Sequence, residues 1–395
     1  MSGTEKQHGN AVAYLFMAFA FTIPWEPMVT LPPFGGISRI VGYAAFGIGG
    51  IIILMTGHWR RPTALFGLQV VFVAYMLISL SWMESYDVLT SGLIRLMTYF
   101  RLLIMSFMVF FLGDSKQVRN GFLGALLLGD VLLIVLTMFS LVSSGQMMST
   151  RIFAPGTNPN GMAGQLALGI PFAVYLAQQV RGGLARWMLW FYVPIALLFV
   201  ALTASRGGLI ASAVALLYIL LLIKSQSLGR RIVVLIALAT VIVIGYRAIP
   251  EANVERLSSI NSELSKEGSI GARRGIWLAA WQAFETKPWL GYGVGQFSVV
   301  APRLGSKSGS SHNTFLAVMV EVGVVGGTIF LLIMWGLFRA SRKMRSAERD
   351  LWLIVLLTWV TISMSGDTLY AKDTWFIFGL LPAFVPDPES EIAES

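Results

Sequence analysis

The chain has 395 residues, of which 56% are hydrophobic and only 12% are charged, whereas charged residues make up about 25% of an average soluble protein. This composition excludes a soluble globular domain and predicts an integral membrane protein. The net charge of +9 is therefore less informative than the way the charges are distributed among the loops. The absence of cysteine excludes disulfides and thiolate metal sites.

Twelve apolar segments follow one another along the chain, and most reach the roughly 17–25 residues that a tilted helix needs to cross a bilayer. We expect an all-α membrane protein with about 12 transmembrane helices, forming a single integral membrane domain over residues 1–395. The first segment lacks an A-x-A-like cleavage site and is interpreted as a retained span, while the short last segment could be re-entrant. The segments cover residues 11–25, 37–56, 63–83, 91–112, 121–142, 161–179, 187–204, 208–223, 232–249, 313–338, 351–365 and 371–385.

The basic residues predict the direction in which the helices cross. Lys and Arg gather in alternate connections, and the richest cluster, Arg339 to Arg349, follows the tenth segment. Because basic residues concentrate in cytoplasmic loops, we expect both termini in the cytoplasm. The long polar segment 250–312, between the ninth and tenth helices, then lies on the outer side, which in a bacterium is the periplasm.

This outer loop contains a predicted short helix followed by a string of glycines, in the sequence GARRGIWLAAWQAFETKPWLGYGVGQF (271–297). Trp277, Ala280, Trp281 and Phe284 recur at helical spacing and form one apolar face. The helix would either lie along the membrane surface, with tryptophan at headgroup level, or pack on the helix bundle. The glycines predict a turn, and alternatively a set of backbone N–H groups that converge on an anion.

Four arginines are candidates for binding an anion at the outer face. Arg206 lies in the tight connection LTASRGGLIAS, at the outer membrane edge, where positive charge is normally depleted. It is either a snorkelling arginine that contacts lipid phosphate or part of an anion site with Arg273 or Arg274. The guanidinium group matches phosphate geometry and contributes roughly 4 kcal/mol of Coulomb energy about 4 Å from a phosphate oxygen near the surface. Arg95, near the outer end of the fourth segment, could join this site.

Two further charges, Arg101 and Asp130, lie at similar depth inside the fourth and fifth apolar segments. Unpaired charges inside a membrane cost several kcal/mol and usually find partners. We therefore expect Arg101 and Asp130 to form an ion pair.

His312, in the sequence SGSSHNTFLAVMVEVGVVGG (308–327), is the only histidine on the predicted outer side. Ser311 or Asn313 can cap the helix that starts here, and a histidine at a helix start is often only a polar cap. An imidazole with an unperturbed pKa of about 6.5 can also exchange protons near neutrality, and His312 closes the loop that carries the arginines. Glu321, deeper in the same helix and on a different face, is expected to be a buried structural or hydrogen-bonding carboxylate.

These residue types suit one class of reaction. We find no His, Asp or Glu cluster with metal-ligand spacing and no Walker or D-x-D motif, so we expect no metal, no cofactor and no nucleic-acid partner. Arginines with one histidine suit a lipid-linked diphosphate, because arginines stabilise the departing charge and a base removes the acceptor's hydroxyl proton. The rival class is a flippase or transporter of lipid-linked glycan, which would favour charges spread through the bundle and helices broken at mid-membrane.

Four stretches of the second half together resemble the bacterial O-antigen ligase and O-antigen polymerase superfamily of integral membrane glycosyltransferases. They are RIFAPGTNPNGMAGQLALGIP (151–171), ASRGGLIAS (204–212), ARRGIWLAAWQAFETKPWLGYGVGQF (272–297) and SHNTFLAVMVEVGVVGG (311–327). The resemblance implies a GT-C-like fold in the bacterial inner membrane, with a large periplasmic loop that carries short amphipathic helices. It also implies transfer of a glycan from undecaprenyl diphosphate to an acceptor hydroxyl at the periplasmic face, with inversion and without metal or nucleotide.

The same resemblance implies roles for particular residues. Arg206 is the arginine of the A-S-R-G turn, Arg273 or its neighbour Arg274 is the arginine of the loop helix, and His312 is the histidine of the H-N pair. The arginines would bind the diphosphate, and His312 would activate the acceptor hydroxyl. Ligases transfer the glycan to lipid A–core, polymerases to another lipid-linked repeat unit, and some relatives to proteins; the four stretches are shared, and we favour a ligase over an O-antigen or exopolysaccharide polymerase.

Overall fold

The computed structural model describes residues 3–32, 35–56, 61–83, 86–144, 151–224, 226–248, 251, 254 and 269–386. Within these residues the protein consists of fourteen α-helices, two 3-10 helices, η1 (Glu26–Met28) and η2 (Leu80–Trp82), and one small ribbon. In the ribbon, β1 (Thr30–Leu31) pairs antiparallel with β2 (Gly35–Gly36). Each of the twelve apolar segments coincides with a helix, which confirms the prediction of an all-α protein.

Six helices in the described part of the chain are long and apolar enough to cross a membrane, as expected for a multi-pass membrane protein. The count of about 12 spans and the orientation of the termini stay predictions. The six candidate spans are Ala64–Trp82, Thr90–Leu112, Lys116–Ser144, Leu184–Leu202, Arg206–Ile223 and Thr314–Arg342.

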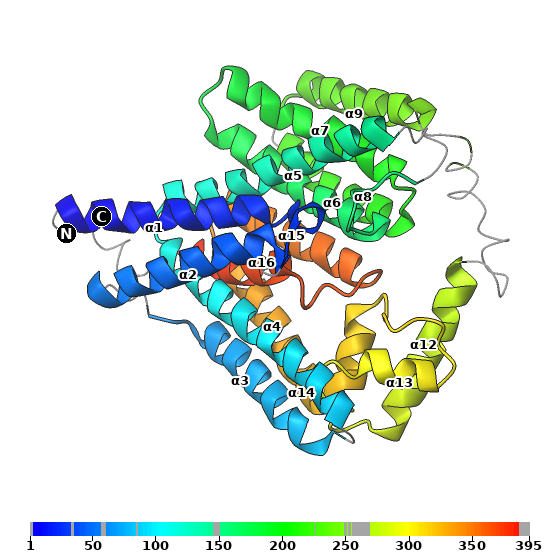
Figure 1. Cartoon of the computed structure of the whole chain (residues 1–395). Helices are drawn as coiled ribbons and strands as arrows, with labels where there is room; N and C mark the ends of the chain where they lie inside the picture. Colours follow the sequence, from blue (N-terminus) through cyan, green and yellow to red (C-terminus); the bar gives the residue numbers. More distant parts are fainter. Residues whose placement is uncertain are drawn as a thin grey trace. The chain divides into compact units, whose positions relative to one another are not determined.

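The helices form two compact units that interleave along the sequence. The first unit draws on residues 1–59, 111–258 and 344–362 and the second on residues 60–110, 259–343 and 363–395. A single integral membrane domain stays a prediction. The first unit holds α1 (Gly3–Thr22), α2 (Ile37–Thr56), α5 (Lys116–Ser144), α6 (Pro159–Gln179), α7 (Leu184–Leu202), α8 (Arg206–Ile223), α9 (Leu228–Ala248) and α15 (Ser346–Ser363) (Figure 1). The second holds α3 (Ala64–Ser79), α4 (Tyr86–Leu112), α12 (Ser269–Thr286), α13 (Phe297–Arg303), α14 (Thr314–Arg342) and α16 (Lys372–Ala383).

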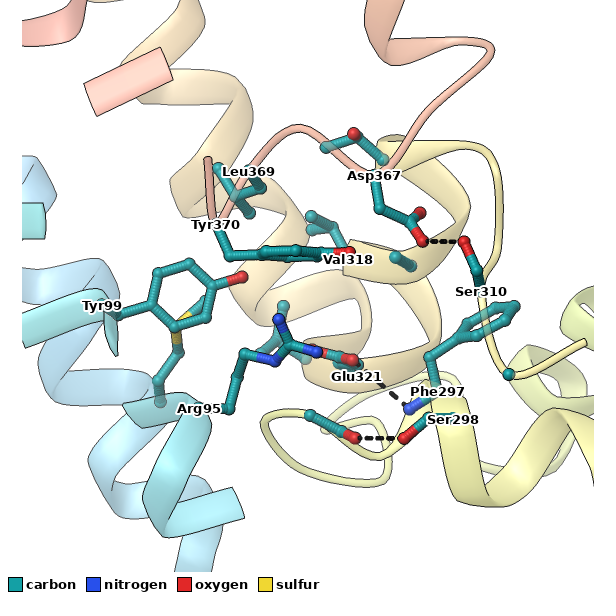
Figure 2. Close-up of a pocket in the computed structure, with 16 residues that line it drawn as sticks. Arg95, Tyr99, Phe297, Ser298, Ser310, Val318, Glu321, Asp367, Leu369 and Tyr370 are labelled. Atoms are coloured by element: carbon teal, nitrogen blue, oxygen red, sulfur yellow. Dashed lines mark hydrogen bonds between the residues drawn. The ribbon is translucent and has the colours of Figure 1, made fainter. Parts of the chain in front are cut away.

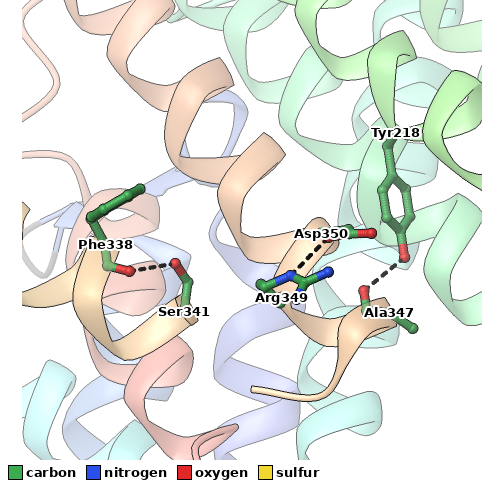
Figure 3. A network of polar contacts seen from close by, with 6 residues as sticks. All are labelled: Tyr218, Phe338, Ser341, Ala347, Arg349 and Asp350. Carbon is green, nitrogen blue, oxygen red and sulfur yellow. Dashed lines mark hydrogen bonds and ion pairs between the residues drawn. The ribbon is translucent and has the colours of Figure 1, made fainter. Parts of the chain in front are cut away.

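In the first unit, α6 packs against α5, α7 and α8. Small residues allow the close approach of α6 and α8, since a Cβ atom at Gly208 would lie only 2.3 Å from that of Ala163. The Tyr218 hydroxyl donates to the Ala347 carbonyl (3.2 Å), joining α8 to the start of α15 (Figure 3). This bundle supports the loops and helix ends that carry Arg206.

Asp130 of α5 is 1% exposed and has hydrogen-bond donors within the first unit. The amide of Gln165 donates to Oδ1 (3.0 Å) and the hydroxyl of Tyr192 donates to Oδ2 (2.9 Å). These donors compensate for burial of the carboxylate. Arg101 belongs to the second unit, and its predicted ion pair with Asp130 stays a prediction.

In the second unit, α12 packs on α13 and α14 through small and aliphatic side chains. Trp277 and Trp281 are 39% and 53% exposed, so they do not form the packed face, and their predicted place at headgroup level stays a prediction. Alanines allow the backbone of α12 to approach its neighbours, whereas two indole rings would hold the helices apart. The buried cluster consists of Ile276, Ala280, Ala283, Phe297, Val300, Ala301 and Val320, so the prediction that the helix packs on the bundle is confirmed.

Helix α14 is broken at Gly323, whose backbone has φ 60° and ψ −162°. The glycine loop, which we define as residues 287–297, replaces the helical hydrogen bonds at the break. The backbone groups are thereby paired within the protein, a requirement for irregular backbone in a membrane segment. The bonds run from Tyr292 N–H to the Val320 carbonyl (3.0 Å), Gly293 N–H to Glu321 (2.7 Å), Val324 N–H to Pro288 (2.8 Å) and Val325 N–H to Trp289 (3.2 Å).

Candidate active site

His312 occupies the turn that begins α14. The side-chain oxygen of Asn313 accepts hydrogen bonds from the N–H groups of Phe315 (3.0 Å) and Leu316 (3.2 Å), so Asn313 is the N-cap. His312 has a φ of 47°, an uncommon value for a residue with a side chain. Because Asn313 does the capping, the imidazole is not needed for that role.

Asp367, from the connection between α15 and α16, holds the turn that leads into His312. Its carboxylate accepts a hydrogen bond from the hydroxyl of Ser310 (Figure 2). It also accepts hydrogen bonds from the hydroxyl and the backbone N–H of Ser311. Ser311 is buried, so these bonds are shielded from solvent. Sequence reasoning did not identify Asp367, because a lone acidic residue in a short connection carries no spacing signal.

The surroundings of His312 favour its neutral form. Burial lowers the pKa of the imidazole below its ordinary value of 6.5; the Asp367 carboxylate opposes this shift, and the Arg273 guanidinium adds to it. The structure therefore brings His312, Arg273 and Asp367 within electrostatic reach of one another. An imidazole that is neutral near pH 7 can accept a proton from a hydroxyl group. Arg274, the next residue in α12, is exposed.

Arg206 is the first residue of α8, in the first unit. The preceding Ser205 donates a hydrogen bond to the side-chain oxygen of Asn160 (2.8 Å). The guanidinium of Arg151 donates to the Thr203 carbonyl (2.8 Å) and to the same Asn160 oxygen (3.5 Å). Two of the stretches singled out in the sequence, 151–171 and 204–212, therefore meet and fix the turn that carries Arg206.

A cavity of about 120 Å³ lies in the second unit beside the turn of His312. The guanidinium carbon of Arg95 lies 4.0 Å from the ring centroid of Tyr370, and Figure 2 shows the guanidinium next to the Glu321 carboxylate. Glu321 accepts a hydrogen bond from the backbone N–H of Phe297 (3.3 Å), which confirms its role as a hydrogen-bonding carboxylate. Arg95 thus lies in a cavity that is also lined by the carboxylates of Glu321 and Asp367.

The glycine loop forms the predicted turn, and its N–H groups serve the protein itself. Gly291, Gly293 and Gly295 all have positive φ, a conformation that glycine adopts at little cost. The N–H of Gly293 donates to the backbone of α14, and that of Val294 donates to the Ser79 hydroxyl (3.0 Å). The alternative of a backbone cradle for an external anion is not supported.

Comparison with known proteins shows that one family model covers three of the four candidate arginines and His312. Residues 191–331 match the family model described as O-antigen ligase. We name this segment the O-antigen ligase domain after the family model that it resembles. It contains Arg206, Arg273, Arg274 and His312.

Two curated relatives extend the match beyond the O-antigen ligase domain. The chain is 25% identical over 264 residues to a general O-oligosaccharyltransferase of Acinetobacter baylyi, covering 60% of this chain but only 45% of that protein. It is 26% identical over 366 residues to an O-antigen ligase of Pseudomonas aeruginosa, covering 86% of this chain and 78% of that protein. The predicted resemblance to the O-antigen ligase superfamily is confirmed.

The O-antigen ligase domain does not include every residue near His312. Arg95, Asp367 and Tyr370 lie outside the matched segment, although they line the cavity beside the turn of His312. The second unit therefore builds this neighbourhood from the matched segment together with residues that precede and follow it.

Proposed function

We propose that this protein transfers a glycan from undecaprenyl diphosphate to an acceptor hydroxyl at the periplasmic face of the bacterial inner membrane. The favoured activity is that of an O-antigen ligase, with lipid A–core as acceptor. The observation that carries the proposal is the imidazole of His312, biased toward its neutral form and placed near Arg273 inside the O-antigen ligase domain.

In the proposed reaction, His312 removes the proton of the acceptor hydroxyl as the oxygen attacks the anomeric carbon of the donor sugar. The bond from that carbon to the diphosphate breaks, and the electron pair leaves with undecaprenyl diphosphate. A single displacement inverts the anomeric configuration. Arg206, Arg273 and Arg274 stabilise the negative charge of the leaving group, so the chemistry needs no metal.

Asp367 has a supporting role in this reaction. Protonation turns the imidazole into a cation, and a nearby carboxylate stabilises that cation. Through its bonds to Ser310 and Ser311, Asp367 also fixes the turn that precedes the imidazole.

A transporter of lipid-linked glycan would share one feature with this protein, the broken helix α14. Here, however, four hydrogen bonds with the glycine loop pair the backbone groups of α14 at the break. These groups are therefore not available to bind a substrate. This difference favours transfer over transport.

The test is glycan transfer in membranes that contain a defined lipid-diphosphate donor and a lipid A–core acceptor. His312→Ala and Arg206→Ala should each reduce transfer at least about 100-fold at matched expression, while donor still binds to the His312 variant. Arg303→Ala, which removes an exposed arginine of α13, is the matched control and should transfer normally. Unimpaired transfer by His312→Ala would reject the assigned base.

The Acinetobacter relative, named a general O-oligosaccharyltransferase, supports a second candidate activity, general O-oligosaccharyl transfer. Adding a lipid-linked repeat unit and a serine-containing protein acceptor to the same assay distinguishes a ligase from a polymerase and from a protein glycosyltransferase. The acceptor that becomes labelled identifies the activity.

A further inference from the structure

The cavity beside the turn of His312 has a chemical character that the diphosphate reaction does not explain. We propose that it binds the sugar residue that presents the acceptor hydroxyl. This inference rests on the proposed function, in which His312 activates that hydroxyl.

The polar groups of the cavity can donate and accept hydrogen bonds, as the binding of a hydroxyl-rich sugar ring requires. The carboxylate of Glu321 can accept hydrogen bonds from sugar hydroxyls, whereas the guanidinium of Arg95 and the hydroxyl of Tyr370 can donate them. The aromatic rings of Tyr99 and Phe297 supply apolar surface for the C–H faces of a sugar. A few convergent polar groups on a mostly apolar wall are typical of small-molecule sites.

The charges of the residues that line the cavity disfavour the binding of a diphosphate. Among the described residues that line the cavity, Arg95 is the one cation, and Glu321 and Asp367 are two carboxylates. A dianionic group placed there would face more negative than positive charge. Arg95 was grouped with the diphosphate-binding arginines on sequence grounds, but its stacking on Tyr370 and its place beside Glu321 favour a role in binding a neutral ring.

The size of the cavity fits one sugar residue. A volume of about 120 Å³ corresponds to about four water molecules at about 30 Å³ each, which is on the scale of one sugar ring and too small for a longer glycan. Tyr370, which lines the cavity, is 38% exposed, so the cavity is open to the outside on the side of this tyrosine. The cavity therefore suits the terminal residue of a longer glycan.

The cavity also adjoins the turn that precedes the proposed base. Ser310 lines it and precedes His312 by two positions, and Asp367 lines it while holding Ser310 and Ser311. A hydroxyl of the bound ring would thus lie near the turn that presents the imidazole. His312 itself is not among the lining residues.

The test is direct binding to the purified full chain in detergent, without donor. The probes are free hexoses, N-acetylhexosamines and a lipid-free core oligosaccharide. Saturation-transfer NMR gives the dissociation constant, and hydrogen exchange of segments 294–298 and 366–371 locates the site. We expect at least one saccharide to slow exchange in both segments of the wild-type protein.

Two cavity variants and one matched control decide the proposal. Tyr370→Ala and Glu321→Gln should weaken binding about tenfold or more, the loss typical of a removed hydrogen bond to a charged group or a removed ring contact. Tyr292→Ala is the control, because Tyr292 also stacks with a cation, Lys287 Nζ at 4.6 Å from its ring centroid, but lies outside the cavity. The control should bind saccharide as the wild type does.

The outcomes separate this inference from the proposed function. His312→Ala should lose transfer but keep saccharide binding. Absence of saccharide binding in a wild-type protein that transfers glycan would overturn the cavity assignment alone. Binding without any transfer activity would overturn the proposed reaction while leaving the cavity a sugar site. Protection of the same segments by inorganic diphosphate or by Ca²⁺ in place of sugar would also overturn the cavity assignment.

Discussion

Replacing Gly323 with alanine should destabilise the second unit more than any ordinary glycine substitution. The backbone at φ 60° and ψ −162° is accessible essentially only to glycine and costs other residues of order 1–3 kcal/mol. A Cβ atom would also lie 2.4 Å from the Trp289 carbonyl oxygen, so the glycine loop must move. If its four backbone bonds to α14 weaken, each contributes about 0.5–1.5 kcal/mol. With about 2 kcal/mol of backbone strain and the loss of two of these bonds at about 1 kcal/mol each, a total of about 4 kcal/mol is expected.

Thermal unfolding of detergent-purified protein, followed by tryptophan fluorescence, measures this effect. A loss of about 4 kcal/mol corresponds to a fall in Tm of about 8–16 °C for a unit of this size. Gly305→Ala is one control, because Gly305 has φ 87° but nothing within 4 Å; it should lose only about 1–2 kcal/mol. Gly275→Ala, in α12 with nothing within 4 Å, should be neutral or gain up to about 1 kcal/mol. The reasoning is refuted if Gly323→Ala unfolds at the same temperature as Gly305→Ala.

Three further predictions concern the site and the core. Because the guanidinium of Arg273 lowers the pKa of His312, Arg273→Gln should raise it, and the histidine signal in an NMR titration should move to higher pH; a shift to lower pH would contradict the assignment. Asn160→Ala should reduce transfer about tenfold by releasing the turn before Arg206, and Asn160→Asp, which keeps the accepting oxygen, should restore it in the same assay. Tyr192→Phe removes a donor from the buried carboxylate of Asp130 and should cost about 1–3 kcal/mol in thermal unfolding, whereas an unchanged Tm would show that the bond is dispensable.

The helices could be predicted from the sequence because long apolar segments leave few alternatives in a membrane. The break of α14 at Gly323 could not be predicted from the sequence. In the sequence VEVGVVGG, valines flank Gly323 on both sides and Glu321 is the one charged residue, so the hydrophobic pattern gives no sign of the break. Only the pairing with the glycine loop, distant in the sequence, reveals that α14 is interrupted.

The site could be predicted in part. His312 and Arg273 lie in motifs that combine distinctive residue types, and the structure places them near each other. Asp367 and the cavity were missed because residues of the two singled-out stretches, 272–297 and 311–327, meet there with Arg95 and with residues 367–370 of a short connection that carries no motif. The packed face of α12 consists mainly of alanines, because small side chains allow close helix packing; the sequence alone left open whether this helix packs on the bundle or lies on the membrane surface. The grouping of Arg206 with His312 stays a prediction.

The interleaving of the two units has a consequence for synthesis. Arg95 enters the growing chain early, but Glu321 and Tyr370 are added only after α5 to α9 of the other unit have been made. During that interval a translocon inserting the chain must accommodate Arg95 without the groups it finally contacts, and an intramembrane charge without partners costs several kcal/mol. We expect ribosome-stalled chains that end before Tyr370 to be rapidly degraded by membrane proteases, and Arg95→Leu to extend their lifetime in a pulse-chase measurement.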